Sequence, residues 1–178
     1  HANGGNAAFS VMANTLRGVY GTDVLLATAN SFTGSVLQAD YNQKMAASMI
    51  MPNGLMSRQR TMTGAELKET VHAFVEGCEG GFVPFNRGSL PVVSGIAVEV
   101  KENNGSYTLT GITRNGQPLG DNDTVTVTCL ATEKQMEALL ASDSGTSAGE
   151  DTWVKNTWRD YISGGAALAE PENYITLR

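Results

Sequence analysis

The stretch TMTGAELKETVHAFVEG, residues 61–77, contains every signal needed for one helix. Thr63 is followed three residues later by Glu66, the spacing of a capping box, in which each side chain bonds the other residue's backbone N–H. Gly77 is a suitable residue to end the helix. Apolar side chains recur at helical spacing and predict one buried face: Leu67, Val71, Phe74 and Val75. We assign this helix a packing role and no chemistry.

The residues before this helix predict a helix, a turn and a buried strand. An apolar stripe marks the first helix, Gly21 ends the turn, and DVLLATA (residues 23–29) is a short strand of the fully buried kind. A polar loop over residues 30–35 follows, then a second short helix over residues 40–47 and a strand over residues 55–62. The stripe consists of Phe9, Met12, Ala13 and Leu16.

The second half of the chain reads mainly as strands. A long strand is expected over residues 90–102, and Asn-Gly pairs after it and after the next strand predict tight turns. The whole of residues 1–178 is therefore expected to form one α/β (mixed α+β) domain, a mixed β-sheet with helices packed on its faces. The other expected elements are strands over 106–114 and 123–130, helices over 133–141 and 151–162, and a short strand within 172–178.

The composition narrows the classes of partner. A net charge of −6 over 178 residues argues against a nucleic-acid backbone or an anionic membrane surface. No run reaches the roughly 18 apolar residues that a membrane helix needs. The two cysteines, Cys78 and Cys129, fit no metal spacing. Buried free thiols are favoured for them, and a disulfide stays open.

No catalytic constellation is found in the sequence. His72 has no acidic partner nearby, and neither a metal-ligand spacing nor a nucleophile, phosphate-loop or dinucleotide motif occurs. A binding site is easier to support. Asn30 follows a buried strand, where ligands of open α/β sheets bind, and its amide can both donate and accept. Phe32 offers a stacking face. The alternative, a turn-forming Asn beside a core Phe, is favoured by spacing alone.

The order of the motifs resembles one family. Over residues 9–178 the chain is similar to the C-terminal domain of 5′-nucleotidases, UDP-sugar hydrolases and 2′,3′-cyclic-nucleotide phosphodiesterases. The motifs that carry the resemblance are Asn30-Ser31 after a buried strand, Met51-Pro52-Asn53, MTGAELK (62–68), VSGI (93–96) and NGQPLGDNDTVTV (115–127).

The resemblance implies a division of labour. In this family a separate N-terminal metallophosphoesterase domain holds the divalent metals and cleaves the phosphate ester. The C-terminal domain binds the nucleoside between two aromatic rings. We thus expect an excised, extracellular, periplasmic or cell-surface domain that holds a nucleoside or nucleotide, with no cofactor or metal of its own and no catalysis alone. The substrate-binding residues implied or considered are Asn30, Arg17, Phe32, Asn53 and Thr132.

Departures from the family pattern leave a second hypothesis open. NSFTGS (30–35) stands where the family has N-G-G-G-I-R, Asn53 replaces an aromatic residue, and Thr132 lies near the position of the second ring. A degenerate domain of the same fold, acting as a structural or protein-interaction module, is the alternative function.

Overall fold

The computed structural model describes residues 7–28, 31–32, 48–50, 53–77, 91–103, 106–140, 145–171 and 175–177. Along the chain these residues form α1 (Ala7–Tyr20), β1 (Val24–Thr28), β2 (Leu55–Thr63), α3 (Gly64–Gly77), β3 (Pro91–Ser94), β4 (Ala97–Asn103), β5 (Ser106–Arg114), β6 (Gln117–Pro118), β7 (Thr124–Thr132), α4 (Glu133–Leu139), β8 (Thr146–Ser147), β9 (Thr152–Trp153), α5 (Val154–Ser163) and β10 (Ile175–Leu177).

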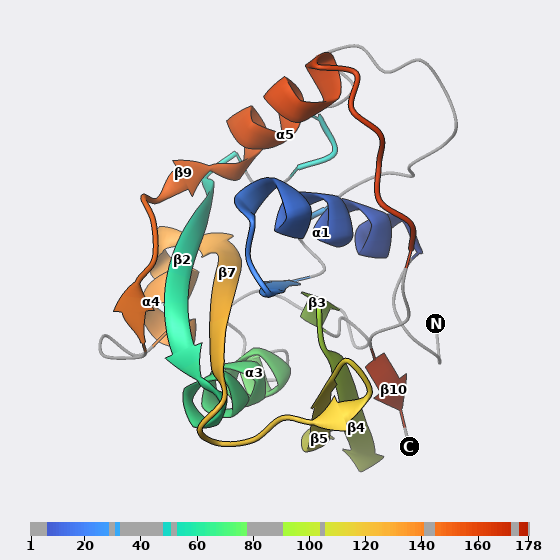
Figure 1. Ribbon diagram of the computed structural model, residues 1–178, viewed down its shortest axis with the longest axis vertical. Coiled ribbons are helices and arrows are strands. Elements are labelled where there is room, and N and C mark those ends of the chain that lie inside the picture. The colour runs from blue at the N-terminus through green and yellow to red at the C-terminus, as the bar shows by residue number, and fades with distance from the viewer. Residues whose placement is uncertain are drawn as a thin grey trace.

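The strands form two sheets, seen in Figure 1. The larger has the order β3-β1-β7-β2-β8, and β9 also pairs with β2. It is mixed, because β1 runs parallel to β7 but antiparallel to β3. The smaller sheet has the order β10-β4-β5-β6 and contains the predicted hairpin of β4 and β5. The expected mixed α/β fold is confirmed, but its strands are divided between two sheets where one was expected.

Helices cover both faces of the larger sheet, which explains the apolar run of β1. Val24 and Leu26 belong to the core beneath α3 and α4, whereas Leu25 and Ala27 belong to the core beneath α1 and α5. Successive side chains of a strand point to opposite faces, so a strand covered on both sides is apolar at every position. All five residues of β1 are buried, as predicted.

The predicted capping box at the start of α3 is present. The Thr63 N–H donates to the Glu66 carboxylate at 2.7 Å, and the Glu66 N–H donates to the Thr63 hydroxyl at 3.3 Å. The same carboxylate also accepts from the N–H of Gly145 at 3.1 Å. These bonds, led by that of the Thr63 N–H, lower the pKa of Glu66. The expected stripe from Leu67 to Val75 is fully buried.

The strand predicted over residues 90–102 is wrong as a single element. It is broken into β3, which joins the larger sheet, and β4, which joins the smaller one. Gly95, between them, has φ +85°, and a Cβ there would lie 2.0 Å from the carbonyl oxygen of Asp23. The chain changes sheets where only glycine fits. The helix predicted over residues 40–47 lies outside the described residues.

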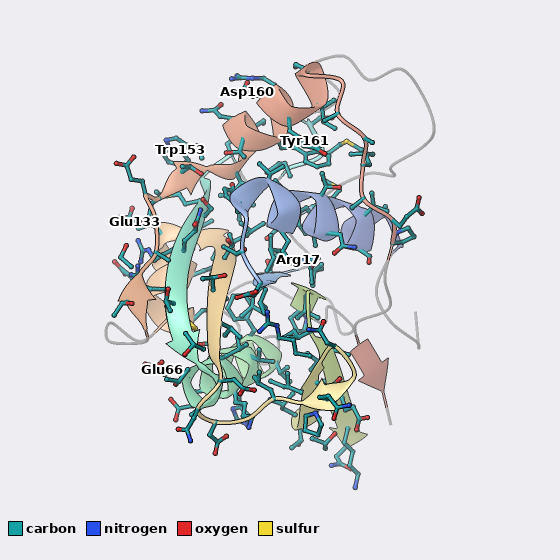
Figure 2. The ribbon with its side chains drawn as sticks, in the orientation of Figure 1. Arg17, Glu66, Glu133, Trp153, Asp160 and Tyr161 are labelled. Carbon is teal, nitrogen blue, oxygen red and sulfur yellow. The ribbon has the colours of Figure 1, made fainter. Side chains whose placement is uncertain are left out.

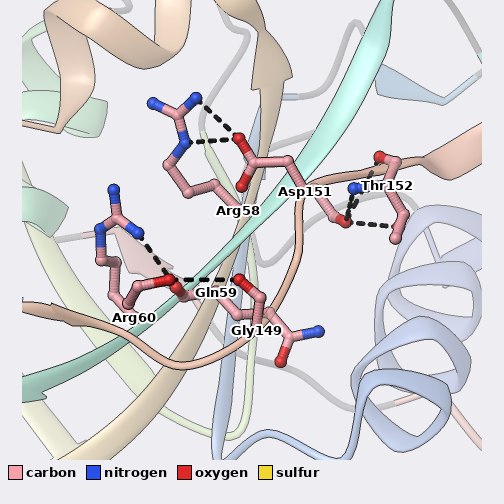
Figure 3. A network of polar contacts seen from close by, with 8 residues as sticks. Arg58, Gln59, Arg60, Gly149, Asp151 and Thr152 are labelled. Carbon is pink, nitrogen blue, oxygen red and sulfur yellow. Dashed lines mark hydrogen bonds and ion pairs between the residues drawn. The ribbon is translucent and has the colours of Figure 1, made fainter.

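The outer edge of β2 is covered by the segment that contains β8 and β9. Figure 3 shows Arg58 of β2 bonding the Asp151 carboxylate through two nitrogens, at 2.8 and 3.0 Å. One residue on, the Thr152 hydroxyl lies 2.8 Å from that of Ser57. Residues 151 and 152, predicted as the start of a helix, are instead tied to this edge, and α5 begins at Val154.

Candidate functional site

The carboxyl ends of β1 and β7 meet at one end of the larger sheet. The two strands are parallel, with Ala27 opposite Leu130, so the segments that leave them start side by side. The start of β2 lies at the same end, since Leu55 pairs with Thr132. This is the sheet end at which the sequence predicts a binding site. Asn30 itself lies outside the described residues.

Thr132 has a structural task at this end. It is the N-cap of α4: its hydroxyl accepts from the N–H of Gln135, and the Gln135 side chain accepts from the N–H of Thr132 at 3.0 Å. A second capping box thus ends β7 and starts α4. The Thr132 hydroxyl both accepts from the N–H of Gln135 and donates to its side-chain oxygen. Its role as a ligand contact remains a prediction.

Asn53 lies in the predicted turn before β2 and is exposed. Its side-chain oxygen accepts a hydrogen bond from the ammonium group of Lys155, in the first turn of α5, at 2.6 Å. The contact joins exposed side chains of residues 102 positions apart. Among the predicted residues that the structure describes at this end of the sheet, Asn53 is exposed, Thr132 is half-buried and Phe32 is buried.

Phe32 is a core residue in this structure. It is 2% exposed and packs against Phe9 of α1, with ring centroids 5.8 Å apart at 40°. Its backbone forms a bridge with Ile50. Of the two interpretations of Phe32 that the sequence allows, the structure shows the second, a core phenylalanine. Its ring does not face a ligand at the surface.

Arg17 lies away from the other predicted residues. Its Nε donates to the Ser94 hydroxyl at 2.8 Å, and Ser94 pairs with Leu25 at the amino end of β1. Thr126, at the same end of β7, is six residues from Thr132, or about 20 Å at the usual rise of a strand. Figure 2 shows Arg17 beneath α1 in the centre of the molecule, whereas Trp153 and Glu133 lie on one flank. The structure does not bring Arg17 together with Asn53 and Thr132.

A charged cluster surrounds Asp23, close to Arg17. The Asp23 carboxylate accepts from the N–H and the hydroxyl of Thr126, at 2.8 and 2.9 Å, and pairs with Arg114 of β5. Partial burial would raise the pKa of Asp23, but the Thr126 hydrogen bonds and the charges of Arg114 and Arg17 outweigh it, so the pKa is lowered. The cluster joins the two sheets, which is a structural role.

The sequence did not single out Trp153, which was assigned to the predicted helix over residues 151–162. It lies on β9 opposite Met56 and is 50% exposed, whereas Trp158 is fully buried. One signal was available: positions 153 and 158 are five residues apart, about 140° around a helix, so the two indoles cannot share one buried face.

The structure adds little that indicates chemistry within the described ranges. No three His, Cys, Asp or Glu side chains there are placed to hold a metal ion. His72 is exposed on α3. Cys129 is a free thiol buried in the core beneath α3 and α4, and burial raises its pKa to about 12. No described helix is long and apolar enough to span a bilayer.

Comparisons with known proteins identify the fold. Neither a protein-family profile nor a curated protein sequence matches the chain. Among solved structures, a 5′-nucleotidase precursor from Thermus thermophilus matches with a TM-score of 0.67 at 14% identity, over 98% of this chain and 36% of that one. The NAD nucleotidase of Haemophilus influenzae matches with a TM-score of 0.69 at 17% identity, over 98% and 33%.

A putative 5′-nucleotidase from Staphylococcus aureus, in complex with α-ketoglutarate, matches with a TM-score of 0.70 at 12% identity, over 99% of this chain and 37% of that one. The chain thus spans about a third of the length of the nucleotidases it matches. At these identities the matches establish the fold, which is that of the 5′-nucleotidase C-terminal domain, as the sequence motifs predicted.

Proposed function

We propose that this chain, with the fold of the 5′-nucleotidase C-terminal domain, is the nucleoside- or nucleotide-recognition part of a larger phosphoesterase and does not break bonds by itself. The observation that supports it most is the extent of the matches: nearly all of this chain, but only 33–37% of each nucleotidase described above. A piece of that size is a domain, and in such a protein the chemistry can reside in the remainder.

The proposal places the ligand at the carboxyl ends of β1 and β7. Open α/β sheets bind ligands at such ends, because side chains and backbone groups of several loops converge there. Asn53 offers an exposed amide at this end, whose oxygen accepts a hydrogen bond from Lys155. An amide both donates and accepts, which suits the edge of a nucleobase.

The proposal includes partners and location. The catalytic partner is an N-terminal metallophosphoesterase domain, and the divalent metals are bound there. The protein acts outside the cytoplasm, at the cell surface, in the periplasm or as a secreted protein. Assay of the purified chain with a nucleoside monophosphate and added Mn²⁺ or Zn²⁺ tests the division of labour: release of phosphate by this chain alone would refute it.

Calorimetric titration with adenosine, uridine and their monophosphates tests recognition directly. We expect saturable heat with at least one of them at micromolar to millimolar concentration. The absence of heat with all four at millimolar concentration would contradict recognition.

Two observations favour a second candidate function, a structural or protein-interaction module of the same fold. Phe32 is buried against Phe9, and the Thr132 hydroxyl is already hydrogen-bonded in the α4 cap, so two of the predicted contact residues have a structural task. The titration separates the candidates, because this module would give no heat with nucleosides.

A further inference from the structure

Two Asn-Gly pairs lie within the described residues, Asn53-Gly54 before β2 and Asn115-Gly116 between β5 and β6. An asparagine followed by glycine is the pair whose side chain reacts most readily with its own backbone, because glycine has no side chain to shield the attacking nitrogen. Both pairs are exposed to solvent. Their surroundings differ, however, and the first pair has a charged group bound to the amide that would react.

The reacting atom of such a pair is Cγ, the carbonyl carbon of the asparagine side chain. In Asn53 the oxygen on this carbon accepts a hydrogen bond from the ammonium group of Lys155 at 2.6 Å. Attack on Cγ moves negative charge onto that oxygen, and a cationic donor already in contact stabilises the charge. The contact is at the surface, so water and salt weaken this effect relative to a buried active site.

The backbone around Asn53 leaves room for the attack. A Cβ at Gly54 would meet no atom within 4 Å outside the adjacent residues. Neither Asn53 nor Gly54 has a positive φ. Leu55, the next residue, is buried and pairs with Thr132 of β7, so the reacting pair stands at the very start of the strand, outside its ladder.

The second pair is held in a conformation that opposes the same reaction. Asn115 has φ +52° and Gly116 has φ +76°, and the flanking residues Arg114 and Gln117 pair across β5 and β6. The pair is thus a two-residue hairpin turn whose dihedral angles match the strands on both sides. Ring closure requires those angles to change, since the glycine nitrogen must approach Cγ. Asn115-Gly116 is therefore an internal comparison for the first pair.

We propose that Asn53 is a site of spontaneous deamidation, in which Lys155 accelerates loss of the side-chain amide. The backbone nitrogen of Gly54 bonds to Cγ of Asn53 and gives up its proton to solvent. The bond between Cγ and the side-chain nitrogen then breaks, and ammonia leaves with a proton taken from water. Water opens the resulting succinimide ring at either carbonyl, which leaves aspartate or isoaspartate at residue 53.

The product has a charged partner already in place. The reaction consumes water and releases ammonia, with no oxidant, reductant or cofactor. The new carboxylate lies next to the ammonium group of Lys155, so an ion pair replaces the hydrogen bond. In isoaspartate the main chain also gains one carbon directly before β2. Negative charge is added at the end of the sheet where we place the ligand, but the reaction itself requires no ligand.

Ageing of the whole chain at mildly alkaline pH, followed by peptide mass analysis and isoaspartate detection, tests the site. In the native protein we expect Asn53 to convert at least about threefold faster than Asn115. In urea we expect the two rates to agree within about twofold, because each asparagine is then followed by an unstructured glycine. This comparison needs no variant, so it decides the question even where a substitution disturbs folding.

Substitution of Lys155 tests its part in the reaction. Lys155→Met is expected to slow conversion of Asn53 about threefold or more, with Asn115 and the thermal midpoint unchanged. Lys134→Met, at an exposed lysine of α4, loses the same charge and is the matched control, expected to convert at the unsubstituted rate. Gly54→Ala has room for its methyl group and is expected to fold normally and to convert more slowly, since the methyl group hinders the nitrogen.

Three results would overturn the proposal. The first is conversion of Asn115 as fast as that of Asn53 in the native chain. The second is unchanged or faster conversion of Asn53 in folded Lys155→Met. The third is a peptide that joins residues 53 and 155 covalently, which would make Lys155 the nucleophile. No nucleoside is present in these experiments, so their outcome is independent of the titration that tests recognition.

Discussion

Asp23 and Thr126 are bonded to each other three times. The Asp23 carboxylate accepts from the N–H of Thr126 at 2.8 Å and from its hydroxyl at 2.9 Å, and the Asp23 N–H donates to that hydroxyl at 2.9 Å. The same carboxylate pairs with Arg114 of β5. One side chain therefore ties the start of β1 to β7 and the larger sheet to the smaller one.

Replacing Asp23 by Asn is expected to destabilise the fold by about 1–2 kcal/mol, since charge-assisted bonds become neutral and Arg114 loses its partner. The expected loss of stability is modest because the carboxylate is partly exposed. The pKa of Asp23 is lowered in the folded state, so its contribution is present above the unfolded pKa of about 4 and is lost as the pH falls through the folded value. Urea unfolding of the unsubstituted protein and of Asp23→Asn between pH 7 and pH 3 measures how this contribution to stability depends on pH.

The difference between the two proteins is expected to stay constant from pH 7 to about pH 5 and to narrow at lower pH. Asp160→Asn is the matched control: its side chain is exposed and bonds only its neighbour Arg159 among the described residues, so its effect is expected to stay within about 0.5 kcal/mol. A difference for Asp23→Asn that does not change with pH would contradict the account.

Gly95→Ala is expected to be severely destabilising. The new Cβ would lie 2.0 Å from the carbonyl oxygen of Asp23, at φ +85°. Gly116→Ala is the control, because Gly116 also has a positive φ, +76°, but nothing lies within 4 Å of its Cβ position. Gly116→Ala is expected to lose about 1 kcal/mol of unfolding free energy. Gly95→Ala is expected to lose at least about 3 kcal/mol or to fail to fold. Equal losses in urea unfolding would refute the close approach as the cause.

Substitution of Thr132 separates its structural role from the predicted contact with a ligand. Thr132→Ala is expected to lose about 1 kcal/mol of unfolding free energy, because α4 loses its cap, whereas Thr132→Ser keeps it. Nucleoside affinity is expected to be unchanged in both. A loss of affinity in the fully folded Thr132→Ala variant that Thr132→Ser restores would show that binding needs the hydroxyl, either directly or through the α4 cap.

Cys129 is expected to be inert in the folded protein. It is fully buried on β7, and burial raises its pKa to about 12, so the reactive thiolate is scarce at neutral pH. In a Cys78→Ser variant, which leaves Cys129 as the one thiol, we expect no reaction with a thiol reagent in buffer and one equivalent in urea. Rapid labelling of the native variant would contradict the burial.

Local signals predicted most of the elements. The capping box at Thr63 and Glu66 gave the start of α3, and the pair Asn115-Gly116 has positive φ at both residues, as its turn requires. The break at Gly95 was missed, although a lone glycine within a strand pattern indicates such a bend. Which sheet a strand joins depends on partners far along the chain: Ser94 pairs with Leu25, and β4 with β5.

The candidate site was less predictable, because it is made by contacts between distant residues. Phe32 and Trp153 are both aromatic residues next to polar ones, and nothing local shows that Phe32 is buried against Phe9. The spacing of Trp153 and Trp158 shows that the two cannot share one buried helix face, but not which of them is exposed. The bond between Lys155 and Asn53 spans 102 residues. The motif order predicted the fold correctly but does not fix which side chains reach the surface.

Hydrogen–deuterium exchange with and without saturating nucleoside monophosphate tests the central claim, that this chain recognises a nucleoside at the carboxyl ends of β1 and β7. The account predicts slower exchange in peptides covering residues 24–32, 53–57 and 151–156, and unchanged exchange around Asp23, Ser94 and Arg114. Identical exchange throughout, or protection confined to the cluster around Asp23, would contradict it.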